Sequence, residues 1–95
     1  MNSITTDNSS KQERPVYEIA RDIYRNWKNV SVYAVPYIAA MTKLNKIEDM
    51  YGLDSGDAII LRFLSNAQGW RGDDARWIKA ELNSMINSYN KRSKV

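Results

Sequence analysis

The sequence predicts an all-α fold, a compact bundle of three main helices and one short helix in a single domain. Apolar residues recur at spacings of three and four in separate segments, which is the period of an amphipathic helix. Proline, glycine and aspartate stand at the ends of these segments, where helices begin and end. The chain has 95 residues, which is enough for one hydrophobic core and too few for two.

The two ends of the chain are predicted to lie outside the bundle. Between Met1 and Arg14 only Ile4 is apolar after the initiator, so this segment cannot bury enough surface to offset the entropy of ordering. We therefore expect it to be a disordered arm. The bundle domain is expected over residues 15–90, and residues 91–95 are expected to form a basic tail.

The first helix is predicted over residues 15–28, with Pro15 in its first turn. Its apolar stripe is formed by Val16, Ile19, Ala20, Ile23, Tyr24 and Trp27. Apolar residues then alternate with their neighbours from Val30 to Ala34, as in a strand. No second strand-like run exists to pair with this one, and a lone strand is not stable, so a connection is predicted.

A short second helix is predicted to begin near Pro36, because the residue before a proline disfavours helical geometry. Its apolar face is formed by Tyr37, Ala40, Met41 and Leu44, with Ile47 as an extension. Gly52 is interpreted as a left-handed helix end. Asp54 and Ser55 are interpreted as N-caps of the next helix.

The third helix is predicted over residues 56–68 and is expected to be central, because its apolar side chains cover more than one face. These are Ala58, Ile59, Ile60, Leu61, Phe63, Leu64 and Ala67. Gly69 and Gly72 bracket a turn, and Asp73 opens the last helix, which is expected to fray near Asn90. Its stripe is formed by Ala75, Ile78, Leu82, Met85, Ile86 and Tyr89.

The composition excludes several classes of site. The chain has no cysteine and no histidine, so thiolate and imidazole zinc sites and Ser/His/Asp or Cys/His catalysis are excluded. We predict that the protein is not an enzyme and needs no cofactor or metal. No apolar run is long enough to span a bilayer, and the start lacks the apolar stretch of a secretion signal, so no membrane partner and a cytoplasmic location are expected.

The positive charge is concentrated in the last third of the chain. The net charge is +3, yet residues 1–64 hold eight basic and eight acidic side chains, whereas residues 65–95 hold six and three. Nucleic-acid binding is therefore the alternative function, through Lys79, Lys91, Arg92 and Lys94. A helix-turn-helix ending in the last helix is disfavoured, because the N-terminal residues that would face the bases are Asp73 and Asp74, which the phosphates would repel.

The candidate binding residues are Trp70, Arg71, Arg76 and Trp77. With the apolar stripe of the last helix turned to the core, the 100° step per residue directs Trp77 to solvent beside Arg76. Exposed tryptophan beside arginine is typical of protein interfaces. Two alternatives stay open: Trp77 is buried by contacts on two sides of its helix, or Trp70 closes one end of the bundle.

A broader pattern runs from Trp27 to Leu82. It includes Trp27, Lys28 and Asn29, Ala34 to Tyr37, Ala40 and Met41, Tyr51 and Gly52, Asp54 to Gly56, Phe63 and Leu64, Asn66 and Ala67, Trp70 to Gly72, Ala75 and Arg76, and Ile78 to Leu82. As a set it resembles a family of small uncharacterised proteins encoded on plasmids, phages and conjugative elements of Gram-positive bacteria. The resemblance implies a genomic setting and no site residues, and Trp77 departs from the basic or polar residue expected there.

Together, these observations predict a non-enzymatic, protein-binding accessory or inhibitor module of a mobile genetic element. A protein partner is expected, with nucleic acid as the alternative partner. The oligomeric state is not predicted by any of these patterns.

Overall fold

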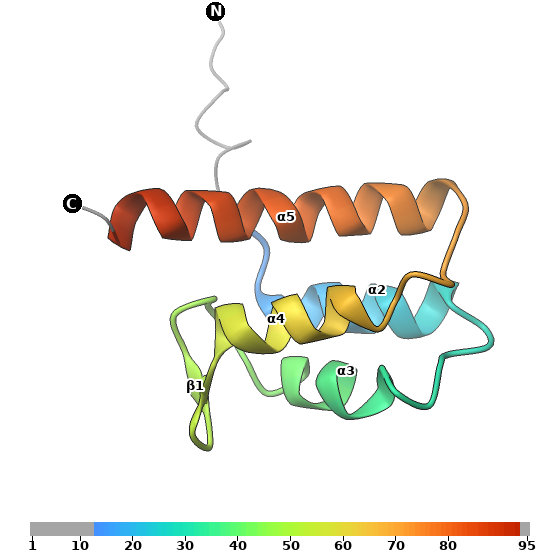
Figure 1. Cartoon of the computed structure of the whole chain (residues 1–95), viewed down its shortest axis with the longest axis horizontal. Helices are drawn as coiled ribbons and strands as arrows, with labels where there is room; N and C mark the ends of the chain where they lie inside the picture. The colour runs from blue at the N-terminus through green and yellow to red at the C-terminus, as the bar shows by residue number, and fades with distance from the viewer. Residues whose placement is uncertain (1–12, 94–95) are drawn as a thin grey trace, which may run out of the picture.

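The fold was determined as a computed structural model, and the structure describes residues 13–93 (Figure 1). Its elements, in chain order, are α2 (Val16–Asn26), α3 (Val35–Met41), β1 (Met50–Tyr51), β2 (Asp54–Ser55), α4 (Gly56–Ser65) and α5 (Asp73–Ser93). The predicted fold class is therefore confirmed for the helices, and one small antiparallel hairpin is added to it.

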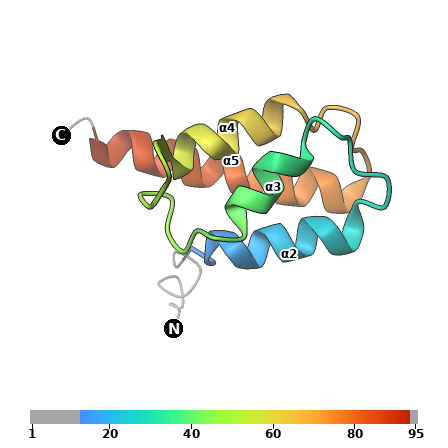
Figure 2. The ribbon, with the colours of Figure 1, turned by 90° about the horizontal axis from the view of Figure 1, so that it is seen from below.

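The four helices surround one core. The long helix α5 lies on one side of the molecule, over α2 and α4, and α3 lies on the opposite side (Figure 1). Seen from below, α3 runs between α2 and α4 (Figure 2). Accordingly, α2 and α4 each pack against both α3 and α5. The core is apolar, with no polar or charged side chain buried among the described residues.

Helix α2 begins after Pro15 and ends at Asn26, two residues before the predicted end. Its stripe Val16, Ile19, Ala20 and Ile23 is buried as predicted, whereas Tyr24 is exposed. The first backbone N–H groups of a helix have no partner within the helix. Here the amides of Val16 and Tyr17 donate to the carbonyls of Asn45 and Leu44, each at 2.9 Å, which ties the start of α2 to the segment after α3.

The hairpin β1–β2 is a correction to the prediction, which contained no strand. Met50 pairs with Ser55 and Tyr51 with Asp54, joined by the two-residue loop Gly52–Leu53. Gly52 has a φ of 64°, so its left-handed conformation was expected correctly, but it serves a hairpin turn and not a helix end. Two-residue hairpin loops need positive φ in the turn, and glycine supplies it without strain.

Helix α4 begins at Gly56 as predicted and ends at Ser65, before the predicted end at 68. Ser55 occupies the N-cap position, but its hydroxyl donates to the Asp57 carboxylate and makes no capping bond to the backbone. The helix is not surrounded by the others: Leu61 is 48 % exposed. The prediction of a central helix is therefore wrong in this respect, because the bundle has helices around the core and none inside it.

Helix α5 extends past the predicted end, to Ser93. The ion pair between Arg92 and Glu48, 2.9 Å apart, connects its last turn to the loop before the hairpin. Residues 91–93 are therefore helical and not part of a tail, and residues 94–95 lie outside the described residues.

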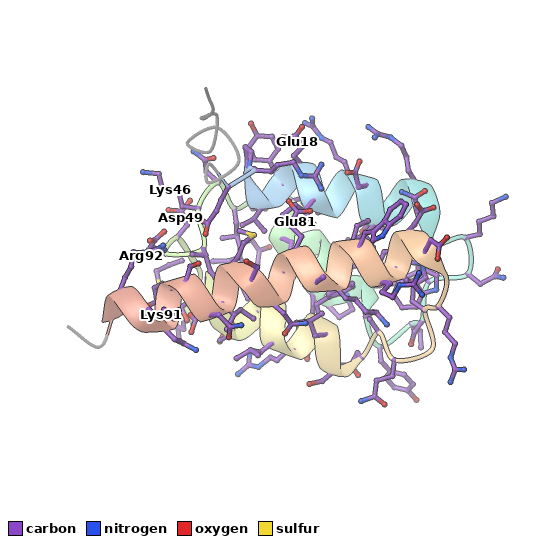
Figure 3. The ribbon with its side chains drawn as sticks, turned by 90° about the horizontal axis from the view of Figure 1, so that it is seen from above. Glu18, Lys46, Asp49, Glu81, Lys91 and Arg92 are labelled. Atoms are coloured by element: carbon purple, nitrogen blue, oxygen red, sulfur yellow. The ribbon has the colours of Figure 1, made fainter. Side chains whose placement is uncertain are left out.

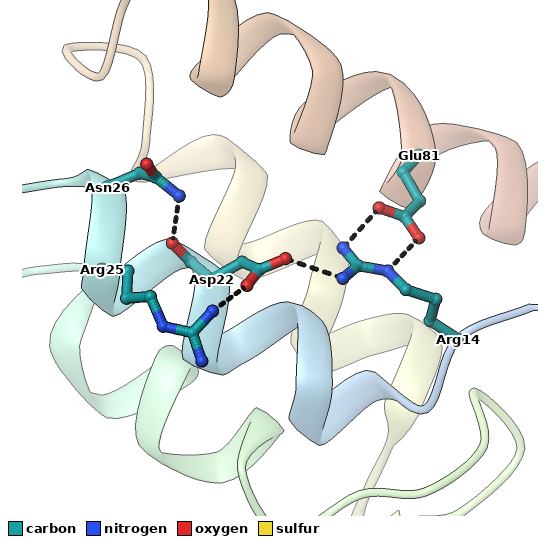
Figure 4. Close-up of polar contacts among 5 residues, drawn as sticks. All are labelled: Arg14, Asp22, Arg25, Asn26 and Glu81. Carbon is teal, nitrogen blue, oxygen red and sulfur yellow. Dashed lines mark hydrogen bonds and ion pairs between the residues drawn. The ribbon is translucent and has the colours of Figure 1, made fainter.

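The predicted N-terminal arm was expected to include Arg14, and for this residue the prediction is wrong. Residues 1–12 lie outside the described residues, but Arg14 is attached to two helices (Figure 4). Its Nε and Nη2 donate to both carboxylate oxygens of Glu81 on α5, each at 2.9 Å, and its Nη1 donates to Asp22 on α2 at 2.7 Å. We call Arg14, Asp22 and Glu81 the Arg14 cluster.

Candidate functional site

The start of α5 is built by a glycine turn and two acids. Gly72 has a φ of 110°, a conformation that residues with a side chain rarely adopt, and it lets the chain turn into the helix. Asp73 and Asp74 follow in the first turn, where the helix dipole favours negative charge. The helix therefore starts where the sequence predicts.

The outward face of α5 carries the predicted tryptophan. Ala75, Ile78 and Leu82 are buried in the core, and Trp77 between them in sequence points away and is 65 % exposed. The alternative that Trp77 is a core residue is therefore wrong. Arg76 is exposed beside it and forms an ion pair with Asp73, one helical turn earlier.

Trp70, by contrast, is buried. Only 4 % of it is exposed, and its ring stacks on Trp27 with the ring centres 5.3 Å apart and the planes 9° from parallel. Trp27 in turn meets Phe63 edge to face at 6.3 Å. The expectation that Trp70 offers an aromatic surface is wrong, and the alternative, that it closes one end of the bundle, is confirmed. Indoles are large apolar groups and pack well against each other.

Arg71 and Arg76 line one shallow hollow of about 230 Å³ at the start of α5, which we call the basic pocket. Its lining residues are Trp70, Arg71, Gly72, Ala75, Arg76 and Lys79. Lys79 was singled out only for the nucleic-acid alternative, and the structure places it in this pocket. Its Nζ donates to the Trp70 carbonyl at 2.7 Å, so the ammonium is fixed in place. Partial burial and the nearby charge of Arg71 lower the pKa of Lys79.

The other residues of the nucleic-acid alternative lie apart from this pocket. Figure 3 shows Lys91 and Arg92 at the far end of α5, with Arg92 on the side of Lys46 and Asp49. Arg92 is paired with Glu48, whereas Lys91 is exposed. Lys94 lies outside the described residues. The predicted basic set is therefore not brought together on one surface by the described residues.

A larger groove, of about 880 Å³, runs along the opposite flank of α5. It is lined by Glu13, Arg14, Pro15, Asn45, Lys46, Glu48, Glu81, Ser84, Met85, Ser88 and Arg92. Acidic and basic side chains alternate in it, and most of them already pair with one another. The hydrogen bonds from Arg14 to Glu81 and Asp22 raise the pKa of its guanidinium further, so this charge is permanent.

Two exposed apolar surfaces were not found from the sequence. The hairpin presents Met50, Tyr51 and Leu53, of which Leu53 is 97 % exposed. The connection before α3 presents Val32 and Tyr33, next to the exposed Val35 at the start of α3. Neither segment is a helix, so no periodicity separates an inner from an outer face, and no local signal was available to identify them.

The described residues contain no cluster of metal ligands. Within residues 13–93 no group of three carboxylates stands close enough to hold a metal ion. Every helix in this range is too short or too polar to cross a lipid bilayer. The absence of enzymatic activity and of a cofactor stays a prediction from composition.

The fold and the site define a small helical domain with an exposed tryptophan and a basic pocket at the start of its longest helix. Comparison of the chain with protein-family models, with curated proteins and with solved structures finds no match. Its function is therefore argued from its own residues.

Proposed function

We propose that this chain is a non-enzymatic, protein-binding module of accessory or inhibitor type from a mobile genetic element. Its contact surface is the α5 surface, which we define as Arg71, Arg76 and Trp77. The observation that carries the proposal is the 65 % exposure of Trp77 on a helix whose opposite face is fixed in the core. The mobile-element setting rests on the family resemblance of residues 27–82 alone.

The exposed indole is large enough to dominate a contact. A tryptophan buries up to about 250 Å² of surface, so the exposed part of Trp77 amounts to about 160 Å². At about 25 cal/mol per Å², covering this surface contributes at most about 4 kcal/mol. Tryptophan and arginine are the residues most often found to supply such contributions in interfaces.

The surroundings of Trp77 leave it accessible. Residues three, four and seven positions later on a helix share a face with it, and here these are Ala80, Glu81 and Ser84. Ala80 and Ser84 are small and exposed, and the Glu81 carboxylate is bound to Arg14. A partner helix or loop can therefore approach the ring closely.

The support beneath this surface is rigid. The stack of Trp70 on Trp27 fills the end of the bundle, and Lys79 holds the Trp70 carbonyl. A contact surface that is already ordered loses little conformational entropy on binding. This favours a site at the start of α5 over one on the loops.

Nucleic-acid binding ranks second for physical reasons. Binding through phosphates requires several free cations along one surface. Among the four predicted residues, Lys79 bonds to a backbone carbonyl, Arg92 is paired with Glu48, and Lys91 lies at the other end of α5. A mobility-shift assay at low salt tests this alternative.

The proposal is tested by photo-crosslinking in the cells that carry the gene. A photoreactive phenylalanine derivative is placed at position 77 and, as the matched control, at position 53 on the hairpin, where Leu53 is equally apolar and more exposed. We expect a defined protein adduct from position 77 that is lost with Arg71→Ala and Arg76→Ala combined. The same adducts from positions 77 and 53, or none from 77, would refute the α5 surface.

A further inference from the structure

Two of the three cations that line the basic pocket have no ion-pair partner among the described residues. Three of its six lining residues are cationic, namely Arg71, Arg76 and Lys79, and none is acidic. Arg76 is paired with Asp73 at the edge of the pocket. Within residues 13–93, no carboxylate forms an ion pair with Arg71 or Lys79.

These two cations are held close together despite their like charges. The bond from Lys79 Nζ to the Trp70 carbonyl uses one N–H of the ammonium and leaves two others. Partial burial and, to a smaller extent, the charge of Arg71 lower the pKa of Lys79, which is the response of an ammonium that lacks a counter-ion. An anion in the pocket would remove this repulsion.

We propose that the basic pocket binds the carboxylate of an acidic side chain in the protein partner, held between the Arg71 guanidinium and the Lys79 ammonium. This inference rests on the proposed function and specifies the chemistry of its partner. A guanidinium presents a planar pair of N–H donors that matches the two oxygens of a carboxylate, and the ammonium supplies a further donor. Trp70, Gly72 and Ala75 form the apolar wall.

The charges around the pocket favour a single carboxylate over a phosphate backbone. Asp73 and Asp74 stand directly after the pocket, in the first turn of α5. A polyanion lying across Arg71 and Arg76 would meet Asp73, which pairs with Arg76, whereas one acidic side chain entering the pocket does not need to. Trp77 lies two residues before Lys79 on α5, so it projects from a different side of the helix and contacts a separate part of the partner.

The test is an NMR titration of the full-length chain at low ionic strength. The probes are a short, end-blocked peptide with two glutamates and a leucine, its counterpart with glutamines in place of glutamates, and a short single-stranded DNA. The readouts are the backbone amide signals of residues 70–79 and the side-chain signal of Lys79. Spectra of each free variant report whether it is folded.

We expect the glutamate peptide to shift these signals and the glutamine peptide to leave them unchanged. Arg71→Gln and Lys79→Gln should each weaken binding about fivefold, the upper range for one exposed ion pair. Lys91→Gln removes the same charge from the far end of α5, and should weaken binding less than about twofold.

Several results would overturn the proposal. Equal shifts with both peptides would show that the carboxylate is not recognised. Equal losses of affinity in all three variants would show that binding depends on net charge and not on the pocket. Shifts with DNA alone would assign the pocket to nucleic acid. If position 77 forms the protein adduct but the glutamate peptide does not bind, the proposed role of the basic pocket is refuted and that of the α5 surface is kept. If the peptide binds but position 77 forms no adduct, the α5 surface is refuted and the role of the pocket is kept.

Discussion

Replacing Gly56 by alanine should destabilise the domain far more than the same change at Gly69. A Cβ at position 56 would lie 2.3 Å from the Ile47 carbonyl oxygen and 2.9 Å from its carbon, whereas ordinary contacts begin at 3.4 Å. The two backbone segments would have to separate by about 1.1 Å. The Gly56 amide also donates to the Asp49 carbonyl at 2.8 Å, and this bond would be lost in the movement.

The magnitude follows from these two effects. Forcing an extra carbon into packed structure costs about 1–3 kcal/mol, and one hydrogen bond contributes about 1 kcal/mol. We therefore expect Gly56→Ala to lower the free energy of unfolding by about 2–4 kcal/mol. For a domain of this size the melting temperature would fall on the order of 10–20 °C.

Gly69→Ala is the matched control, because no atom lies within 4 Å of its Cβ position and its φ is not positive. Its effect should stay within about 0.5 kcal/mol. Both variants are measured by equilibrium unfolding in urea, with an unchanged denaturant dependence as the sign that only stability has changed. If Gly56→Ala were no less stable than Gly69→Ala, the close approach of Ile47 to α4 would be refuted.

Four further predictions follow from individual contacts. Arg14→Ala should lower the free energy of unfolding by about 1–2 kcal/mol, a value reduced because the ion pairs are partly exposed. Arg25 is more exposed, so Arg25→Ala should change the free energy of unfolding by less than about 0.5 kcal/mol. Equal losses of stability in thermal melts of the two variants would contradict the role of the Arg14 cluster. Trp70→Ala should lower the free energy of unfolding by about 3–5 kcal/mol and Trp77→Ala by less than about 0.5 kcal/mol, and the reverse order in denaturant titrations would refute their placement. Folding lowers the pKa of Lys79, so between that pKa and 10.5 the unfolded chain binds more protons than the folded chain, and stability rises with pH across this window. Arg71→Gln should raise the pKa of Lys79 and make this increase in stability smaller. NMR titration of the Lys79 side chain measures the change in pKa. The amides of Lys46 and Asn45 lower the pKa of Asp49, so the stabilisation by its carboxylate is present above pH 3.8 and is lost as the pH falls through the lowered pKa. Asp49→Asn should therefore make stability depend less on pH in this acidic range. An unchanged pH dependence of the free energy of unfolding would exclude the contribution of Asp49.

Helix periodicity made most of the fold predictable. The sequence pattern agrees with the buried stripes of α2 and α5 and with the starts of α4 and α5. An amphipathic helix can bury its apolar stripe only by turning that face toward the core. The hairpin was missed because two strands of two residues are too short to show a period. Gly52 gives the same left-handed signal at a hairpin turn as at a helix end.

The residues of the candidate site were likewise predicted correctly within a helix and incorrectly in a turn. Trp77 was correctly directed outward because it lies within a helix, where the positions of neighbouring core residues determine its direction. Trp70 lies in a turn, and its burial depends on Trp27, a partner far away in the sequence. Arg14 was assigned to the arm for the same reason: its neighbours in sequence are polar, and its partner Glu81 is 67 residues away.

The stacked rings of Trp27 and Trp70 give this domain a built-in optical signal. Two nearly parallel indoles at short range couple their electronic transitions, so this part of the near-ultraviolet circular dichroism exists only while the two loops that carry them are docked. Trp77 is instead 65 % exposed, so its emission is expected to respond to quenchers and to a partner bound at the proposed α5 surface. Loop docking and surface occupancy can therefore be recorded separately in one unlabelled sample, and coincident transitions of the two signals would establish cooperative unfolding.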